Sequence, residues 1–191
     1  MTGSDTAQEA AELMAEIAAG RESALARLIV LHGRNIVLFA GRYLGNPADG
    51  EDIAQETFLK VWRMAGSYDP TRAGVTTWMY RIAVNLCIDR QRRNRFWRVF
   101  GRADVTEIAD ALPGGEPDAL TKLAGKQRLQ RVRVAIAALP ERQRMAIMLA
   151  AVAGLQTDEI AASMGTSPGA VEQLLVRARR ALRHDVGDED E

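Results

Sequence analysis

Apolar positions recur along most of the chain with the three-to-four-residue period of an α-helix. In PADGEDIAQETFLKVWRMA, two apolar rows that begin at Ile53 and Ala54 lie opposite a polar stripe. No segment has the two-residue alternation that is typical of a half-buried strand. Asn46 directly before Pro47 is a helix-start signal, and Gly165 is a helix-end signal. The pattern therefore predicts an all-α protein.

The helical period fails between residues 101 and 125, where the chain is rich in glycine, proline, alanine and aspartate. We therefore expect two small helical domains, residues 8–98 and residues 125–184, joined by a flexible acidic linker at residues 99–124. The acidic residues 185–191 are expected to form a disordered tail.

The second domain contains the pattern of a helix-turn-helix. Ala161 supplies the small residue between the two helices, and Gly165 supplies the turn. The expected apolar anchors are Ile160, Met164, Val171 and Leu174. An ordinary helical hairpin with a glycine turn would explain these anchors, but not the arginine-rich end of the second helix. We therefore favour DNA binding through the outward face of that helix, which consists of Gly169, Glu172, Gln173, Val176, Arg177, Arg180 and Arg183.

The first domain carries a polar stripe on the helix that begins near Pro47. Its members share one helix face and are Asp52, Gln55, Glu56, Leu59 and Arg63. A solvated face is the ordinary explanation of such a stripe. Leu59 in its middle indicates a docking surface.

Aromatic residues alternate with arginines in the next segment. The aromatic residues are Tyr68, Trp78, Tyr80, Phe96 and Trp97, and the arginines are Arg72, Arg81, Arg90, Arg92, Arg93, Arg95 and Arg98. Aromatic faces that stack on bases, among cations that contact phosphates, suit single-stranded DNA. In the alternative explanation Trp78 and Tyr80 are core aromatics. We expect this of one of the two, because Trp78, Ile82 and Leu86 form a plausible buried row.

Composition and charge narrow the class of protein. The net charge is zero, yet residues 57–102 carry ten Lys and Arg against two Asp and Glu, and residues 126–184 carry ten against four. Two basic blocks suit a protein that contacts nucleic acid at two places. One cysteine, Cys87, and two distant histidines predict no disulfide, metal site or cofactor. Because we find no nucleophile–base pair, export signal or membrane-length apolar run, we expect a cytoplasmic protein that is not an enzyme and does not insert into a membrane.

Three segments in this order resemble the sigma-70 family, in its compact extracytoplasmic-function (ECF) branch. They are DGEDIAQETFLKVWR, TTWMYRIAVNLCIDRQRR and LPERQRMAIMLAAVAGLQTDEIAASMGTSPGAVEQLLVRARRALR. The resemblance implies an alternative sigma factor that directs the RNA polymerase core to specific promoters and promotes DNA opening. A helix-turn-helix regulator that binds DNA without polymerase is the alternative.

The resemblance also implies site roles. The stripe from Asp52 to Arg63 would dock on the polymerase core, and the recognition helix would read the −35 element. The linker would run toward the active-site cleft of the polymerase. The residues assigned to the −10 element are Tyr68, Asp69, Arg72, Trp78, Tyr80 and Arg81.

The resemblance makes control by an anti-sigma factor, often in a stress response, a further expectation. The sequence gives an independent reason to expect an anti-sigma factor, because we find no third domain, metal site or cysteine pair that would sense a signal. Both domains would also leave a functional face open to solvent.

Overall fold

Helices make up nearly all of the chain that the structure describes, as the periodicity predicts. The computed structural model describes residues 3–100 and 119–186. The order is α1 (Gly3–Ala18), α2 (Glu22–Leu44), α3 (Pro47–Met64), the short 3-10 helix η1 (Ala65–Ser67), α4 (Val75–Phe100), α5 (Ala119–Ala138), α6 (Glu141–Ala151), α7 (Thr157–Met164) and α8 (Pro168–Val186). The all-α prediction is confirmed.

Helices α2 and α3 form a tight antiparallel hairpin in the N-terminal domain. Gly45 ends α2 in the left-handed conformation, with φ of 75°, and the Asn46 side chain accepts a hydrogen bond from the Ala48 amide at 3.0 Å. Gly50 then lies directly on α2, where a Cβ atom would lie 2.6 Å from the Val37 carbonyl oxygen. The approach of the two helices therefore requires glycine at position 50.

The core of this domain lies where α1, α2, α3 and α4 meet. Phe39 and Tyr80 pack edge to face with ring centroids 5.4 Å apart, and Leu28 and Ile53 are fully buried beside them in the same cluster. Thr57, one turn after Ile53 on the same helix, is also buried and donates a hydrogen bond to the Ile53 carbonyl. The inner face of α3 is thus the one that its apolar rows predict.

The C-terminal domain is built on α6, α7 and α8, with α5 packed along α8. The Glu159 side chain accepts from the Gln156 amide at 2.9 Å, in a capping box that makes Gln156 the N-cap of α7. Gly165 ends α7 with φ of 61°, as the turn requires. On α8 the apolar anchor next to Val171 is Leu175, while Leu174, which the sequence favoured, is only partly buried.

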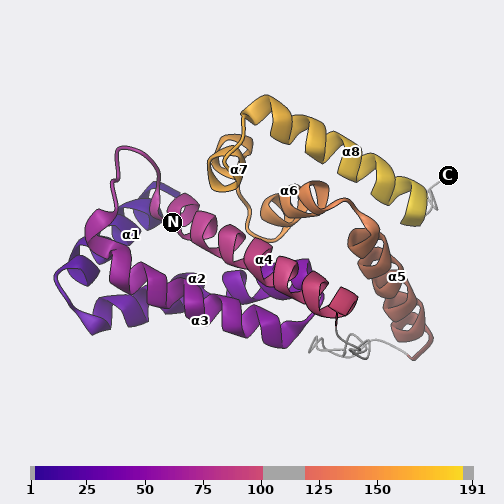
Figure 1. Ribbon diagram of the computed structural model, residues 1–191, viewed down its shortest axis with the longest axis horizontal. Helices are drawn as coiled ribbons and strands as arrows, with labels where there is room; N and C mark the ends of the chain where they lie inside the picture. Colours follow the sequence, from indigo (N-terminus) through magenta and orange to yellow (C-terminus); the bar gives the residue numbers. More distant parts are fainter. Residues whose placement is uncertain (1–2, 101–118, 187–191) are drawn as a thin grey trace.

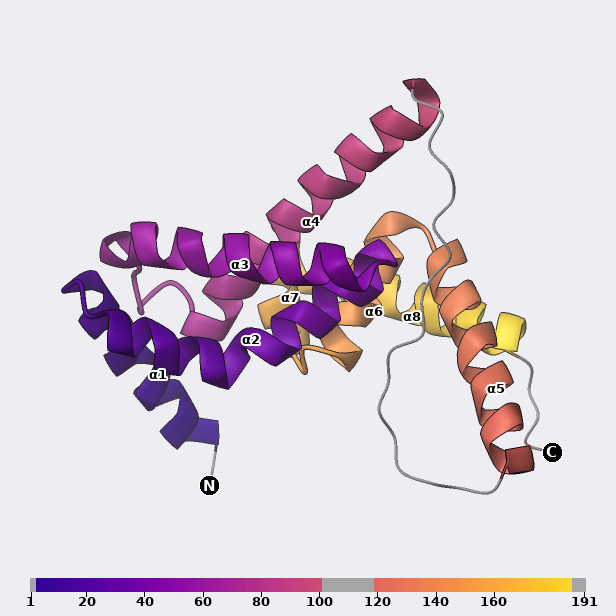
Figure 2. The same ribbon diagram turned by 90° about the horizontal axis from the view of Figure 1, so that it is seen from below.

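The two domains lie against each other. Helix α4 runs between the N-terminal helices and the pair α6 and α7 (Figure 1), and α7 contacts α4 while α6 contacts α2. Seen from below, the C-terminal half of α4 projects away from the N-terminal helices (Figure 2). Residues 101–118, which fall in the predicted linker, and residues 187–191 of the predicted tail lie outside the described residues. Helix α5 begins inside the range assigned to the linker.

One helix of the described residues, α2, is long and apolar enough to cross a membrane by length and composition alone. This differs from the sequence-based expectation that no apolar run approaches that length. In the fold α2 is a core helix that packs against α1, α3 and α4. Part of its apolar surface is buried among these helices, while Ile29, Val30 and Leu31 are exposed.

Candidate functional site

The polar stripe on α3 lies on the outside of the N-terminal domain. Asp52, Gln55, Leu59 and Arg63 are exposed and Glu56 is half-buried. Leu59 has 46% of its surface exposed although it is apolar. The structure thus brings all five predicted residues to one open helix face, which a partner can reach without any rearrangement of the core.

Arg90 on α4 contacts this stripe. The sequence did not predict that contact. Its guanidinium binds Asp49 at 2.5 Å and Asp52 at 3.3 Å, and lies 3.7 Å from Glu56. The Arg90 and Asp49 side chains are only 19% and 14% exposed. The inclusion of Arg90 among cations that contact phosphates was therefore wrong, since it is already paired with three carboxylates. Arg90 follows Asp52 by 38 residues, so no local pattern in the sequence indicates that the two side chains form an ion pair.

The loop between η1 and α4 is held in shape by its own side chains. The Tyr68 hydroxyl donates to the Ala73 carbonyl at 3.1 Å, and Asp69 accepts from the Thr71 amide at 2.9 Å and the Thr71 hydroxyl at 2.6 Å. These bonds to Thr71 lower the pKa of the Asp69 carboxyl, and burial raises the pKa of the Tyr68 phenol. The loop is therefore preorganised and leaves Arg72 exposed at its tip.

The start of α4 carries the remaining residues assigned to the −10 element. Trp78 is half-buried and its ring lies 5.5 Å from that of Tyr68, while Arg81 is exposed. Arg72 lies in the loop just before α4, so an aromatic ring and two exposed cations are close to one another in sequence at the start of this helix.

Tyr80 does not belong to this surface. It is 2% exposed and packs against Phe39, and its buried hydroxyl has no hydrogen-bond partner among the described residues. Burial raises the pKa of Tyr80 to about 12. The assignment of Tyr80 to DNA was therefore wrong. Tyr80 is the core aromatic of the pair, whereas Trp78, which the sequence placed in a buried row with Ile82 and Leu86, is only partly buried.

The outward face of α8 is as the sequence predicts. Val171, Leu175 and Ala178 point into the domain, and the opposite side of the helix is open. The seven residues assigned to the −35 element are all exposed, and they are Gly169, Glu172, Gln173, Val176, Arg177, Arg180 and Arg183. The Ser167 hydroxyl accepts from the Ala170 amide at 3.3 Å and fixes the start of this helix.

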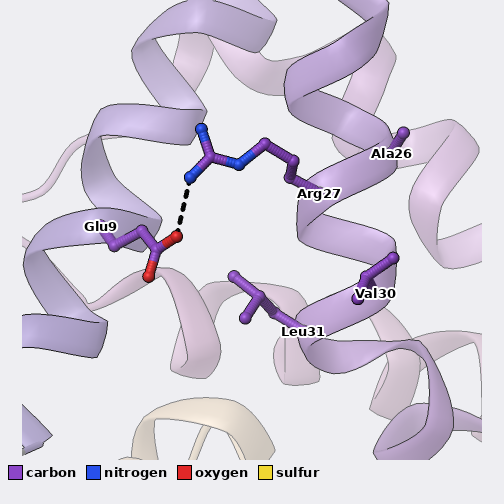
Figure 3. Close-up of a pocket in the computed structure, with 5 residues that line it drawn as sticks. All are labelled: Glu9, Ala26, Arg27, Val30 and Leu31. Carbon is purple, nitrogen blue, oxygen red and sulfur yellow. Dashed lines mark hydrogen bonds and ion pairs between the residues drawn. The ribbon is translucent and has the colours of Figure 1, made fainter. Parts of the chain in front are cut away.

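A small open pocket lies elsewhere, between α1 and α2 (Figure 3). It is lined by Glu9, Ala26, Arg27, Val30 and Leu31, and an ion pair of 2.9 Å joins Arg27 to Glu9 across it. Within the described residues we find no group of His, Cys, Asp and Glu side chains that could hold a metal ion. The part of the chain that the structure describes thus presents three exposed surfaces: the stripe on α3, the loop with the start of α4, and the outward face of α8.

Comparison with known proteins shows the family of the chain. The family model described as sigma-70 region 2 matches residues 28–96, which hold the stripe, the loop and most of α4. The model described as sigma-70, region 4, matches residues 129–182, which hold the helix-turn-helix. The ECF RNA polymerase sigma factor SigW of Bacillus subtilis is 31% identical over 180 residues, which cover 91% of this chain and 94% of SigW. The chain belongs to the ECF sigma factors of the sigma-70 family.

Other similar proteins agree with this family. The RNA polymerase sigma factor CnrH of Cupriavidus metallidurans is 32% identical over 174 residues, which cover 89% of this sigma factor and 90% of CnrH. The solved structure of CnrH in complex with the cytosolic domain of CnrY matches with a TM-score of 0.68 and 28% identity, and covers 96% of this chain and 99% of that one. The sigma factor RpoE of Bartonella quintana, solved with the anti-sigma factor NepR, has the same fold, with a TM-score of 0.67 at 23% identity and coverage of 87% and 98%.

Proposed function

We propose that this sigma factor uses its three surfaces for three separate tasks in transcription initiation. The stripe on α3 docks on the polymerase core, the loop and the start of α4 bind the −10 element as opened single strand, and the outward face of α8 reads the −35 element in the major groove. The observation that carries the proposal is the presence of all three exposed surfaces on one chain. A regulator that binds DNA without polymerase would use α8 alone and leave the other two unexplained.

The further properties of the protein follow from this assignment. It acts in the cytoplasm and catalyses no reaction of its own, since its surfaces position other macromolecules. Its activity is controlled by a separate anti-sigma factor. Two similar proteins support this: CnrH was solved with the cytosolic domain of CnrY, and RpoE of B. quintana was solved with the anti-sigma factor NepR. A stress signal that releases the partner would then start transcription.

Docking on the polymerase core is best tested at Leu59. Reversal of Asp52 or Glu56 would also place a cation beside Arg90, so lost binding could reflect a damaged fold. The Leu59 side chain is exposed, and a change there should alter the free energy of unfolding by less than about 0.5 kcal/mol. We expect Leu59→Glu to weaken binding to the core at least tenfold. Ala26→Glu, at an exposed position on α2, is the matched control and should bind normally.

Promoter opening is tested by removing two exposed cations, with Arg72→Ala and Arg81→Ala together. Open-complex formation, followed by permanganate reactivity of unpaired thymines, should fall more than closed-complex binding. Arg42→Ala, an exposed arginine on α2, should leave both unchanged. Equal permanganate reactivity for the double variant and the parent would reject this assignment.

Recognition of the −35 element is tested at Glu172. A glutamate accepts from the cytosine amino group, whereas an arginine donates to guanine. Glu172→Arg should therefore change the selected base at one position, whereas Arg180→Ala should weaken all promoters about equally. The same selected −35 sequence for Glu172→Arg and for the parent would place the recognition helix in another register.

A further inference from the structure

Arg90 lies where the buried face of α4 reaches the surface beside α3. Cys87, about one turn earlier on the same helix face, is fully buried, whereas the Arg90 side chain is only mostly buried. The guanidinium is therefore at the border between the core and solvent. From there it contacts the polar stripe on α3.

The guanidinium divides its contacts between one inner and two outer carboxylates. Its Nη1 atom donates to Asp49 Oδ1 at 2.5 Å, and the Asp49 side chain is mostly buried. Both Nη atoms donate to Asp52 Oδ2 at 3.3 Å, and Nη2 lies 3.7 Å from Glu56 Oε1. The side chains of Asp52 and Glu56 are much more exposed than that of Asp49. Asp49 thus fixes the cation, and the fixed cation holds one oxygen of each outer carboxylate.

The second oxygen of each outer carboxylate is open to a partner. Asp52 Oδ1 and Glu56 Oε2 make no hydrogen bond or ion pair within residues 3–100 and 119–186. A side chain that is already held in its bound orientation loses less conformational freedom when a partner binds. A cation that fixes Asp52 and Glu56 in advance therefore favours binding to their open oxygens.

We infer that Arg90 is a positioning residue for docking on the polymerase core, because it fixes Asp52 and Glu56 so that their open oxygens accept hydrogen bonds from the core. This inference rests on the proposed docking function of the stripe. In the opposite arrangement Arg90 would compete with the core for the same two carboxylates. The distances favour positioning, since the shortest contact of Arg90 is to Asp49, which a partner cannot readily reach.

Arg90→Lys in the full-length protein separates positioning from stability. Lysine keeps the positive charge and can pair with Asp49, but its single nitrogen cannot replace the two Nη atoms that also contact Asp52 and Glu56. We expect Arg90→Lys to bind the core at least about fivefold more weakly than the parent, with a urea midpoint close to that of the parent. Arg42→Lys, at an exposed position on α2, is the matched control and should bind normally.

A double-mutant cycle shows whether Arg90 acts through the two carboxylates. Asp52→Asn with Glu56→Gln keeps the shape of both side chains and leaves the ion pair of Arg90 with Asp49 in place. We expect these two changes to weaken core binding at least about tenfold, and Arg90→Lys in the same chain to weaken it less than about twofold further. All affinities are measured at a temperature at which circular dichroism shows every variant to be folded.

Three results would overturn the inference. A purely structural role of Arg90 would give the same loss of affinity with and without the two carboxylates. Unchanged binding by Arg90→Lys in the parent chain would show that the core does not need the bridge, and tighter binding would show that Arg90 competes with the core.

Leu59→Glu separates failure of the inference from failure of the docking proposal. If Asp52→Asn with Glu56→Gln binds like the parent while Leu59→Glu binds weakly, the stripe docks without its carboxylates and the inference alone fails. If Leu59→Glu also binds like the parent, the stripe does not dock on the core and the proposed function of this surface fails.

Discussion

Arg90 offers the sharpest test of how the N-terminal domain is held together. Arg90→Met keeps most of the length and apolar stem of the side chain and removes the cation that α4 supplies to three carboxylates of α3. The loss of the ion pair with Asp49 should cost the most stability. The Asp49 side chain is only 14% exposed, so water cannot readily replace the lost partner. Asp52 and Glu56, which are 59% and 43% exposed, are rehydrated more easily.

These exposures set the expected change in the free energy of unfolding. A charge-assisted hydrogen bond to a mostly buried group contributes about 1.5–3 kcal/mol. Each of the two more exposed pairs adds about 0.2–1 kcal/mol. We therefore expect Arg90→Met to lower the free energy of unfolding by about 2–5 kcal/mol, where an exposed arginine would cost less than about 0.5 kcal/mol.

Urea denaturation followed by tryptophan fluorescence is the assay. All three tryptophans, Trp62, Trp78 and Trp97, belong to the N-terminal part of the chain, so the signal reports this domain. Arg92→Met is the matched control, because Arg92 is exposed on the same helix. Asp49→Asn in the Arg90→Met chain should recover part of the loss, because it removes the unpaired charge. If Arg90→Met shifts the urea midpoint no more than Arg92→Met does, the carboxylate cluster does not stabilise the domain.

Three further outcomes follow from packing and burial. Tyr80→Phe removes a buried hydroxyl that has no hydrogen-bond partner within residues 3–100 and 119–186. The unfolding free energy should therefore stay within about 1 kcal/mol of the parent or rise, and promoter opening should not change; a clear loss of opening would show that Tyr80 contacts DNA. Gly50→Ala forces a Cβ atom onto the backbone of α2 and should cost at least about 1–3 kcal/mol by urea denaturation, whereas Gly66→Ala, where a Cβ atom meets nothing within 4 Å, should cost far less. Because burial raises the pKa of Cys87 to about 12, iodoacetamide at pH 8 should modify this thiol only after unfolding, as mass spectrometry would show; rapid modification of the folded protein would contradict its burial.

Local signals in the sequence were sufficient for much of the fold. The start of α3 at Asn46 and Pro47 and the turn at Gly165 each depend on residues within one or two helical turns, and the structure has both. The exposed face of α8 likewise follows from the period of its own apolar residues. These features could be predicted because each has its physical cause within a few residues of itself.

The features that the sequence did not reveal depend on distant partners. Trp78 and Tyr80 are two residues apart on one helix, and only the position of Phe39 on α2 decides which ring is buried. Arg90 finds its carboxylates on α3, and Thr77 meets Ser163 from the other domain. Helical periodicity says which residues share a face, but it does not say what lies against that face.

Transcription by purified RNA polymerase core on a library of random promoter sequences tests the central claim most directly. The account predicts that the protein makes the core start transcription from a subset of templates that share two separated elements, near −10 and −35, and that the protein alone binds these templates weakly. Transcripts that are the same with and without the protein, or tight and specific binding of the templates by the protein alone, would contradict it.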